Sequence, residues 1–282
     1  MGNIMVSICC QTYNHKDYIG QAIDSFLMQK TKFTFEILLR DDASTDGTEE
    51  ICQEYAAKYP DLINLLSYVE NQYQKGVSPF RDNVKRARGK YIALCEGDDY
   101  WTDPLKLQKQ VEFLEGNEEY VICYHDSEII NTEGKVIKTS KLKSRFKRDA
   151  SQEDLKKGFK ILTQTMCYRN VIRSLPKEAV LTFGGDKFLT SMLGAYGKGK
   201  FLADIKKSRF RVHPRGVNRG ITNEKQKTRN FLRTRISLYL YYERKSEADI
   251  RDHYLKEINK LSNSILDKKD STALTNFFRR LK

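Results

Sequence analysis

Residues 90–107 read KYIALCEGDDYWTDPLKL, and this stretch indicates the fold class. Lys90–Cys95 is an apolar run of the length of a buried strand, and it leads directly into the acidic sequence Glu96-Gly97-Asp98-Asp99. After Pro104, apolar residues recur at helical intervals. A strand, an acidic turn and a helix in this order are typical of an α/β protein that binds its ligand at the carboxyl end of a strand.

The sequence before residue 90 repeats this alternation. Apolar runs predict strands at residues 6–10, 35–39 and 62–68. Apolar side chains that recur every three or four positions predict helices at residues 18–29, 48–59 and 79–88. Successive β-α-β units predict a mostly parallel or mixed sheet covered by helices, with polar loops at the carboxyl ends of its strands.

The second half of the chain is less regular. Further elements are expected as strands at 121–124 and 200–204, a helix at 187–196, and helices from Thr228 onward. Residues 138–158 are mostly Lys, Arg, Ser and Asp with little apolar periodicity. We expect a mobile loop or insert there.

The net charge of +13 on the 282 residues is divided unevenly. Residues 1–140 hold 15 Lys and Arg against 23 Asp and Glu, whereas residues 141–282 hold 35 against 14. The acidic half suits metal-assisted chemistry, and the basic half suits an anionic partner such as nucleic acid, a membrane surface or a phosphorylated substrate. A charged surface that serves only solubility is the alternative for the basic half.

The cysteine pattern and the apolar runs indicate the protein class. The six cysteines are scattered without a Cys-x-x-Cys pair, so we expect buried, reduced thiols rather than a zinc site or disulfides. No apolar run approaches the roughly 20 residues of a membrane-spanning helix, and no secretory leader opens the chain. These features predict a globular cytoplasmic protein.

Three acidic positions lie where a parallel sheet would place its chemistry. Asp41 and Asp42 follow a predicted strand, and because adjacent carboxylates repel each other, a ligand role is favoured for Asp42 over a capping role in this loop. The acidic run at 96–99 suits a divalent cation, with a solvated turn as the alternative. Asp186 follows two glycines and introduces a helix, so helix capping competes there with a chemical role.

Taken together, three motifs resemble the family 2 glycosyltransferases. They are VSICCQTYN at residues 6–14, DDASTDGT at 41–48 and KYIALCEGDDYWTDPLKL at 90–107. Gly185-Asp186 and Phe210–Pro214 are similar to later signatures of the family, and the resemblance covers roughly residues 4–218. It implies the GT-A fold, a Rossmann-like mixed sheet that binds a nucleotide sugar.

The resemblance also implies a division of the chain. Residues 1–220 would form the catalytic domain, with the nucleotide-sugar half at about 1–105 and the acceptor half at about 106–220. Residues 221–282 would form a basic helical extension.

Several site residues follow from the resemblance. In similar enzymes the loop after the first strand lies against the base and ribose, and an acid in the place of Asp42 accepts a hydrogen bond from the base. The implied nucleotide-sugar contacts are Gln11, Tyr13, Asn14, Asp42, Asn83, Arg86, Glu96 and Asp98. Arg86 is alternatively a solvated helix residue.

Glu96-Gly97-Asp98 occupies the place of the family's Asp-x-Asp motif. The resemblance implies Mg²⁺ or Mn²⁺ held by Asp98 and Asp99, with His213 as a further ligand or a loop anchor. Glu96 is one methylene longer than the usual aspartate, which leaves open whether it touches the metal directly or contacts ribose. Asp186 matches the general base of similar inverting enzymes.

The implied activity is inverting transfer of a hexosyl or N-acetylhexosaminyl group from a nucleotide sugar, with UDP-sugars favoured. The acceptor would be a hydroxyl of a glycan or lipid-linked saccharide in cell-surface polysaccharide synthesis. The basic half and the terminal residues Phe277–Lys282 would add peripheral contact with the anionic inner face of the plasma membrane.

Two other function classes fit parts of the sequence. One is a non-catalytic basic protein that binds nucleic acid or membrane, but no recognition helix or zinc finger is found, so nucleic acid is not expected as a partner. The other is a metal-dependent nucleotidyltransferase, which lacks the expected Gly-rich and basic phosphate loop because residues 11–17 carry only Lys16.

Overall fold

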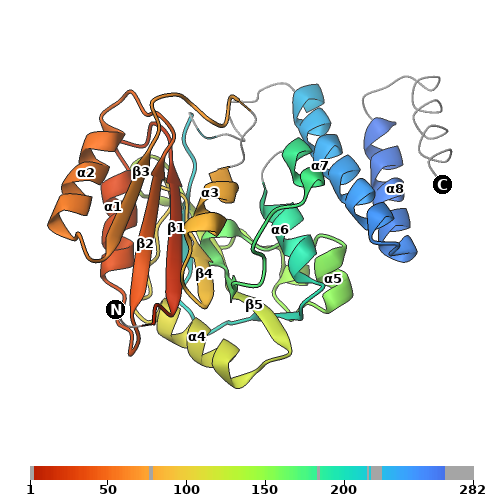
Figure 1. Cartoon of the computed structure of the whole chain (residues 1–282), viewed down its shortest axis with the longest axis horizontal. Coiled ribbons are helices and arrows are strands. Elements are labelled where there is room, and N and C mark those ends of the chain that lie inside the picture. Colours follow the sequence, from red (N-terminus) through yellow and green to blue (C-terminus); the bar gives the residue numbers. More distant parts are fainter. Residues whose placement is uncertain (1–2, 76–78, 183–184, 215, 217–223, 264–282) are drawn as a thin grey trace.

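The computed structural model describes residues 3–75, 79–182, 185–214, 216 and 224–263. Within these residues a seven-stranded sheet has the order β3-β2-β1-β4-β8-β5-β9 (Figure 1). Its strands are β1 (Val6–Thr12), β2 (Phe35–Asp41), β3 (Ile63–Ser67), β4 (Tyr91–Leu94), β5 (Tyr120–Tyr124), β8 (Cys167–Arg169) and β9 (Lys198–Phe201). The first four strands are parallel, whereas β8 runs antiparallel to both of its neighbours. The predicted mixed α/β sheet is confirmed.

Helices cover both faces of the parallel strands. Figure 1 shows α1 (Ile19–Leu27) and α2 (Thr48–Lys58) on one side and α3 (Pro79–Arg86) on the other. The helix after β4 is α4 (Lys106–Gly116). Because side chains alternate along a strand, Tyr91 and Ala93 of β4 join the core with α1, whereas Ile92 and Leu94 join the core on the opposite face.

The second half of the chain covers that opposite face. Its helices are α6 (Asp186–Leu193), α7 (Glu224–Arg244) and α8 (Ala248–Ser262), with short 3₁₀ turns η2 (Thr163–Thr165) and η3 (Lys177–Leu181). Tyr242 of α7 stacks on Tyr254 of α8 with ring centroids 5.9 Å apart, and its hydroxyl lies 2.9 Å from Ser191 Oγ of α6. In the described part of the chain, no helix is long and apolar enough to cross a membrane. The terminal segment Phe277–Lys282 lies outside the described residues.

Residues 138–158 combine loop segments with short regular elements, so the prediction of a loop or insert holds only in part. β7 (Val136–Lys138) pairs with β6 (Ser127–Ile130) in a small sheet completed by β10 (Ser208–Arg211). The elements that follow are η1 (Ser144–Phe146) and α5 (Gln152–Lys156). Leu142, Ala150 and Leu155 are buried, but they are too few and too irregularly spaced to form a periodic pattern. The local signal is Ser151-x-x-Asp154, a reciprocal helix cap.

All six cysteines are free and buried, as predicted. Burial raises the pKa of the Cys52 thiol to about 12, so that thiol stays protonated at neutral pH. The prediction of structural thiols is therefore consistent with their environment.

The loop after β2 contains a residue with an unfavourable backbone conformation. Ala43 has φ = 62°, in the left-handed region that costs a non-glycine residue roughly 1–2 kcal/mol. We expect Ala43→Gly to raise the free energy of unfolding by about 0.5–1 kcal/mol, after the added entropy of the unfolded glycine is subtracted. Urea unfolding measures the change.

The matched control is Ala57→Gly on the exposed surface of α2. The same substitution within a helix should lower the free energy of unfolding by about 1 kcal/mol. A loss of stability in both variants would contradict the assignment of strain to Ala43.

Candidate functional site

The loops after β1, β2 and β4 meet at the carboxyl edge of the parallel strands. Gly97 N donates a hydrogen bond of 2.9 Å to Gln11 O, and Asp42 N donates one of 3.1 Å to Thr12 O. The two backbones approach closely at Gly97, since a Cβ atom there would lie 2.8 Å from Thr12 Oγ1. Glycine at position 97 thus lets the acidic loop lie against the end of β1.

This close approach predicts a stability effect. Gly97→Ala should lower the free energy of unfolding by about 1–3 kcal/mol, because the added methyl group overlaps Thr12 Oγ1 and Cβ. Gly116→Ala at the end of α4 is the control, since nothing lies within 4 Å of its Cβ position. If both substitutions lowered the free energy of unfolding equally in urea, close packing at Gly97 would not be the cause of the loss.

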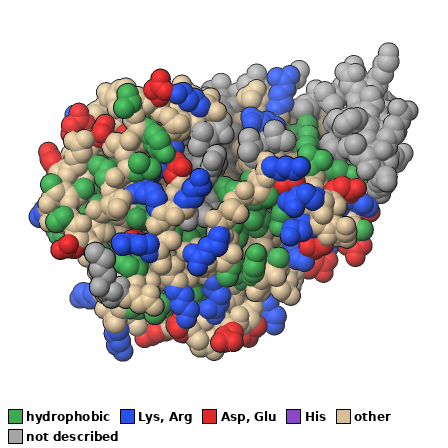
Figure 2. Space-filling model, in the orientation of Figure 1, with side chains coloured by type: hydrophobic (Ala, Val, Ile, Leu, Met, Phe, Trp, Pro, Cys, Tyr) green, Lys and Arg blue, Asp and Glu red, His purple; other side chains and the backbone are tan. Residues whose placement is uncertain are grey.

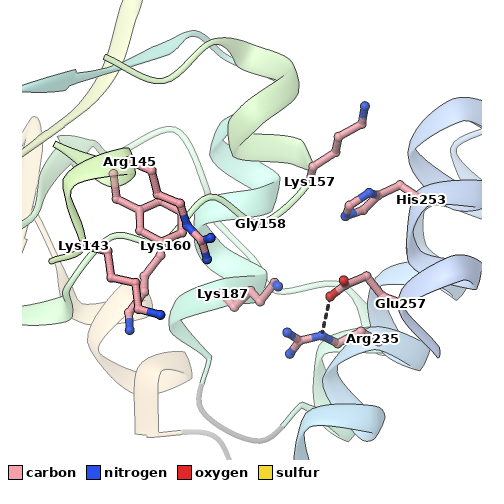
Figure 3. Close-up of a pocket in the computed structure, with 10 residues that line it drawn as sticks. Lys143, Arg145, Lys157, Gly158, Lys160, Lys187, Arg235, His253 and Glu257 are labelled. Carbon is pink, nitrogen blue, oxygen red and sulfur yellow. Dashed lines mark ion pairs between the residues drawn. The ribbon is translucent and has the colours of Figure 1, made fainter. Parts of the chain in front are cut away.

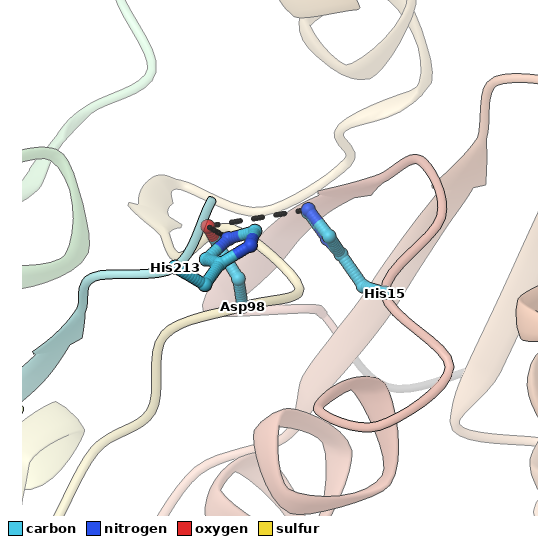
Figure 4. A group of neighbouring side chains, drawn as sticks. All are labelled: His15, Asp98 and His213. Atoms are coloured by element: carbon cyan, nitrogen blue, oxygen red, sulfur yellow. Dashed lines mark hydrogen bonds and ion pairs between the residues drawn. The ribbon is translucent and has the colours of Figure 1, made fainter. Parts of the chain in front are cut away.

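Three side chains from distant parts of the chain converge at this edge (Figure 4). Asp98 Oδ2 lies 3.0 Å from His213 Nε2 and 4.0 Å from His15 Nε2. One potential ligand atom from each residue lies within 4.8 Å of the other two. The structure therefore brings together Asp98 and His213 and adds His15, which the sequence analysis did not single out.

The charge states of this cluster suit a divalent cation. Burial lowers the pKa of His15, so its imidazole is neutral at physiological pH. Burial works to raise the pKa of Asp98, but the hydrogen bond from His213 and the charges of the two histidines lower it overall. A carboxylate with two imidazole rings fits a transition-metal ion such as Mn²⁺ better than Mg²⁺, which prefers an all-oxygen shell.

Asp99 points to a different set of partners. Its Oδ1 accepts a hydrogen bond of 2.8 Å from Arg211 N, and the side chain is buried. Burial, with the charges of Asp98 and Glu96, raises the pKa of Asp99 well above its usual range. Arg211 also donates to Asp98 O at 3.1 Å. The structure thus uses Asp99 to join the acidic loop to β10 and does not bring it into the cluster of Asp98, His15 and His213.

Glu96 and Asp186 lie close enough to influence each other electrostatically. Burial, Asp98 and Asp186 together raise the pKa of Glu96 to about 7. Asp186 is the exposed first residue of α6, and its Oδ1 accepts a hydrogen bond of 2.8 Å from Lys187 N. Desolvation by the surrounding protein raises the pKa of Asp186, and the Lys187 N–H and the charge of Lys141 partly offset the shift.

Lys141 is a cation that the sequence analysis did not single out. Burial lowers its pKa to about 8, while Asp99, Glu96 and Asp98 act in the opposite direction. Its position among three carboxylates supplies positive charge that offsets their mutual repulsion. Lys141 belongs to the basic stretch that had been predicted to be a loop, so only the fold reveals its neighbours.

The predicted nucleotide contacts of the first loop differ in exposure. Tyr13 is 41% exposed, so its ring is free to stack against a planar ligand. Asn14 has φ = 55°, and its Oδ1 accepts a hydrogen bond of 2.8 Å from Thr45 N. Gln11 lies near the end of β1 and is partly buried. The structure therefore places Asn14 as a link between the β1 and β2 loops, with Tyr13 beside it on the surface.

Asp42 is buried, and its carboxylate has partners within the protein. Its two oxygens accept hydrogen bonds from Gln72 N at 2.9 Å and Tyr73 N at 3.1 Å. Arg40 Nη2 lies 3.1 Å from Asp42 Oδ1. Arg40 is itself fully buried and was missed by the sequence analysis, because it reads as an isolated charge at the end of an apolar strand.

The two predicted contacts on α3 also differ. The side-chain amide of Asn83 is fully buried, and among the described residues its nitrogen and oxygen have no hydrogen-bond partner. Arg86 donates to Leu39 O at 3.3 Å and Asn64 O at 2.7 Å, which ties α3 to β2 and β3. Arg86 therefore has a structural role between α3 and the sheet. Of these two predicted contacts, only Asn83 has side-chain groups that are not already used in hydrogen bonds within the described residues.

Comparison with known proteins assigns the family. The sequence model of glycosyl transferase family 2 matches residues 7–175, which contain the loops after β1, β2 and β4. The chain belongs to this glycosyltransferase family. The acidic motif, the loop of Asp42 and strands β2 to β8 fall within the matched region, whereas β9 and β10 lie beyond it.

The relatives of this glycosyltransferase include proteins from several bacteria. It is 43% identical over 166 residues to the uncharacterized protein Rv1520 of Mycobacterium tuberculosis, an alignment that covers 58% of this chain and 46% of the relative. It is 38% identical over 112 residues to the Escherichia coli protein WfaP, described as a UDP-Glc:alpha-D-GlcNAc-diphosphoundecaprenol beta-1,3-glucosyltransferase, covering 39% of this chain and 41% of the relative. The chain thus spans about half the length of these relatives or less.

Solved structures share the fold of this glycosyltransferase. S. aureus TarS 1–349 in complex with UDP-GlcNAc superposes with a TM-score of 0.62 at 20% identity, covering 92% of this chain and 72% of that one. The mannosyltransferase PcManGT of Pyrobaculum calidifontis, in complex with GDP-Man and Mn²⁺, gives a TM-score of 0.59 at 14% identity, covering 100% of this chain and 81% of that one. At these identities the likeness establishes the fold alone.

Proposed function

We propose that this glycosyltransferase moves a hexosyl or N-acetylhexosaminyl group from a nucleotide sugar, with a UDP-sugar favoured, to a hydroxyl of a glycan or lipid-linked saccharide. The observation that supports this proposal is the cluster of Asp98, His213 and His15. Glu96 lies beside it in the sequence, and the charge of Asp186 contributes to the raised pKa of Glu96. Inverting sugar transfer needs a cation that stabilises the leaving group and a carboxylate that accepts the proton of the acceptor. A cation site next to carboxylates of raised pKa offers both groups.

The donor class rests on the comparisons as well as on the site. The fold neighbour TarS was solved with UDP and with UDP-GlcNAc, and the relative WfaP is described as using UDP-Glc. The residue of this chain best placed to meet the nucleotide is Tyr13, whose ring is exposed, whereas Asn83 is fully buried. We assign Asp42 an indirect role, in which it holds the backbone of residues 72–73 and so supports the region where the nucleotide base would bind.

The reaction needs a stabilised leaving group and a deprotonated acceptor. A divalent ion held by Asp98, His213 and His15 would neutralise charge on the departing diphosphate. Asp186 would accept the proton of the acceptor hydroxyl, because it is exposed at the start of α6 and its raised pKa makes it a stronger base than an ordinary aspartate. Lys141 would hold Glu96 and Asp99 in place through its positive charge.

The pathway context is part of the same proposal. Relatives described as putative glycosyltransferases for teichuronic acid, and as acting on a diphosphoundecaprenol-linked sugar, favour cell-surface polysaccharide synthesis. Peripheral contact of the basic half with the inner face of the membrane would bring the enzyme to a lipid-linked acceptor.

Calorimetry tests the donor class. UDP-GlcNAc, UDP-Glc and GDP-Man are titrated into the protein with Mn²⁺, and again with EDTA, while UTP and ATP serve as comparison ligands. We expect a UDP-sugar to bind and to bind more weakly in EDTA. Binding of nucleoside triphosphates without binding of any nucleotide sugar would overturn the proposal in favour of nucleotidyl transfer.

A further inference from the structure

A second pocket of about 420 Å³ lies on the acceptor half of the chain, between α6, α7, α8 and the segment around η1 (Figure 3). We call it the basic pocket. It is lined by six Lys and Arg side chains: Lys143, Arg145, Lys157, Lys160, Lys187 and Arg235. Glu257 is the one acidic side chain among its lining residues.

Most of this positive charge is uncompensated. Glu257 lies 3.5 Å from Arg235, and Lys157 pairs with Glu153 on its own helix turn. Within the described residues, Lys143, Arg145, Lys160 and Lys187 make no ion pair. Burial and the charge of Arg235 lower the pKa of Lys187 to about 8. Like charges held together in a concave site are unfavourable unless an anion neutralises them.

The pocket differs from the rest of the visible surface. On the face in Figure 2, Lys and Arg side chains are interspersed with acidic and uncharged groups. In the pocket, by contrast, cations from four separate segments line one cavity (Figure 3). Gly158 makes room for one of them, because a Cβ atom there would collide with the Lys187 side chain. Lys and Arg side chains that serve only solubility have no need to gather around one cavity.

Two residues that line the basic pocket are neighbours of residues in the proposed transfer site. Lys187 follows Asp186 directly in α6. Lys160 is close enough to Lys141 to lower the pKa of Lys141, which also interacts with Glu96. A ligand in the pocket would therefore lie near Asp186, whereas the donor diphosphate would belong with the cation site at Asp98.

We propose that the basic pocket binds a phosphate or diphosphate group of the sugar acceptor. The inference rests on the proposed function and deepens it by naming the acceptor class. Guanidinium and ammonium groups are the side chains that recognise phosphate oxygens, Arg through paired hydrogen bonds and Lys as a point charge. A neutral glycan would leave the cluster of cations without a counter-charge.

The test measures binding of inorganic pyrophosphate by calorimetry at low ionic strength in EDTA, where the cation site does not recruit it. The variant Arg145→Gln/Lys160→Gln removes two exposed pocket charges. Lys30→Gln/Lys32→Gln removes two exposed charges beyond α1 and is the matched control. We expect the pocket variant to bind pyrophosphate at least about tenfold more weakly and the control to stay within about twofold of wild type. Equal weakening in both variants, or no binding to wild type, would overturn the inference.

Two further arms separate the sources of the phosphate and the two proposals. Competition by geranyl diphosphate but not glycerol 3-phosphate supports a lipid diphosphate acceptor, and the reverse order supports a phosphodiester polymer. Competition by neither overturns the inference. UDP-sugar binding is measured in the same variants and should not change. If the pyrophosphate result overturns the inference but the wild-type protein still binds a UDP-sugar, the proposed function is unaffected. If the wild-type protein binds no UDP-sugar, the proposed function itself is wrong.

Discussion

Replacing Asp186 with asparagine is expected to lower the rate of sugar transfer by about 10²-fold or more while donor affinity stays within about twofold of wild type. Asparagine preserves the shape of the side chain but cannot accept a proton. The charge of Asp186 acts on Glu96, and within the described residues no side-chain hydrogen bond joins Asp186 to the cluster of Asp98, His213 and His15, so we expect donor binding to change little. Product formation under donor saturation gives the rate, and calorimetry gives the donor affinity.

The pH dependence of the wild-type rate provides a second measurement. A general base must be ionised, so the rate should rise with pH through the pKa of Asp186 and level off above it. Because desolvation raises that pKa, the rising limb should lie above the usual range of an aspartate. The limb should disappear in Asp186→Asn.

The alternative role of Asp186 is support of the α6 N-terminus, where its carboxylate accepts the Lys187 N–H. That role predicts a loss of stability with little change in rate. Asp61→Asn, on the exposed surface before β3, controls for removal of a surface carboxylate and should change neither quantity. Transfer by Asp186→Asn near the wild-type rate would leave only the helix-terminus role.

The parallel half of the fold could be predicted because its signals are local. Strands β1, β2 and β4 are continuous apolar runs, and α1 and α2 carry one apolar face each, so periodicity defines them without tertiary information. The acidic motif and Asp42 could be placed at the same edge because parallel strands end on the same side of a sheet.

The composition of the cation cluster could not be predicted in this way. His15 lies 83 positions before Asp98 in the numbering, and the two meet because β1 and β4 are adjacent, with Cys9 opposite Leu94. Asp99 follows Asp98 directly, yet the turn directs it to Arg211 N on β10. The sequence suggested Asp98 and Asp99 as the ligand pair because they are adjacent, whereas the order of the strands brings Asp98 to His15.

The second half of the chain was harder to predict because its secondary structure depends on tertiary contacts. Leu142, Ala150 and Leu155 are each isolated among charged residues, and their burial comes from packing against β5, α6 and the later helices. Lys141 and Lys160 read as solvated charges for the same reason. Their roles depend on which carboxylates and cations the fold brings to face them.

The neighbouring aspartates of the acidic motif allow the sharpest test of the cation site. Asp98→Asn should weaken Mn²⁺ binding by at least about tenfold and remove most metal-dependent transfer, because among the described residues it replaces the one carboxylate that lies with both histidines. His213→Ala should act in the same direction. Calorimetry with Mn²⁺ measures affinity separately from transfer, so a defect in the acceptor site does not affect the result.

Asp99→Asn is the matched control, the same substitution one residue away. An asparagine Oδ1 still accepts the Arg211 N–H, and loss of the negative charge relieves repulsion from Asp98 and Glu96. We therefore expect Mn²⁺ affinity in Asp99→Asn to stay within about threefold of wild type, with the fold retained. Equal losses in the two variants would mean that both carboxylates hold the ion, whereas normal Mn²⁺ affinity in Asp98→Asn would remove the cluster from the mechanism. Because the two substitutions are chemically identical, only the different positions of the two side chains can separate their effects.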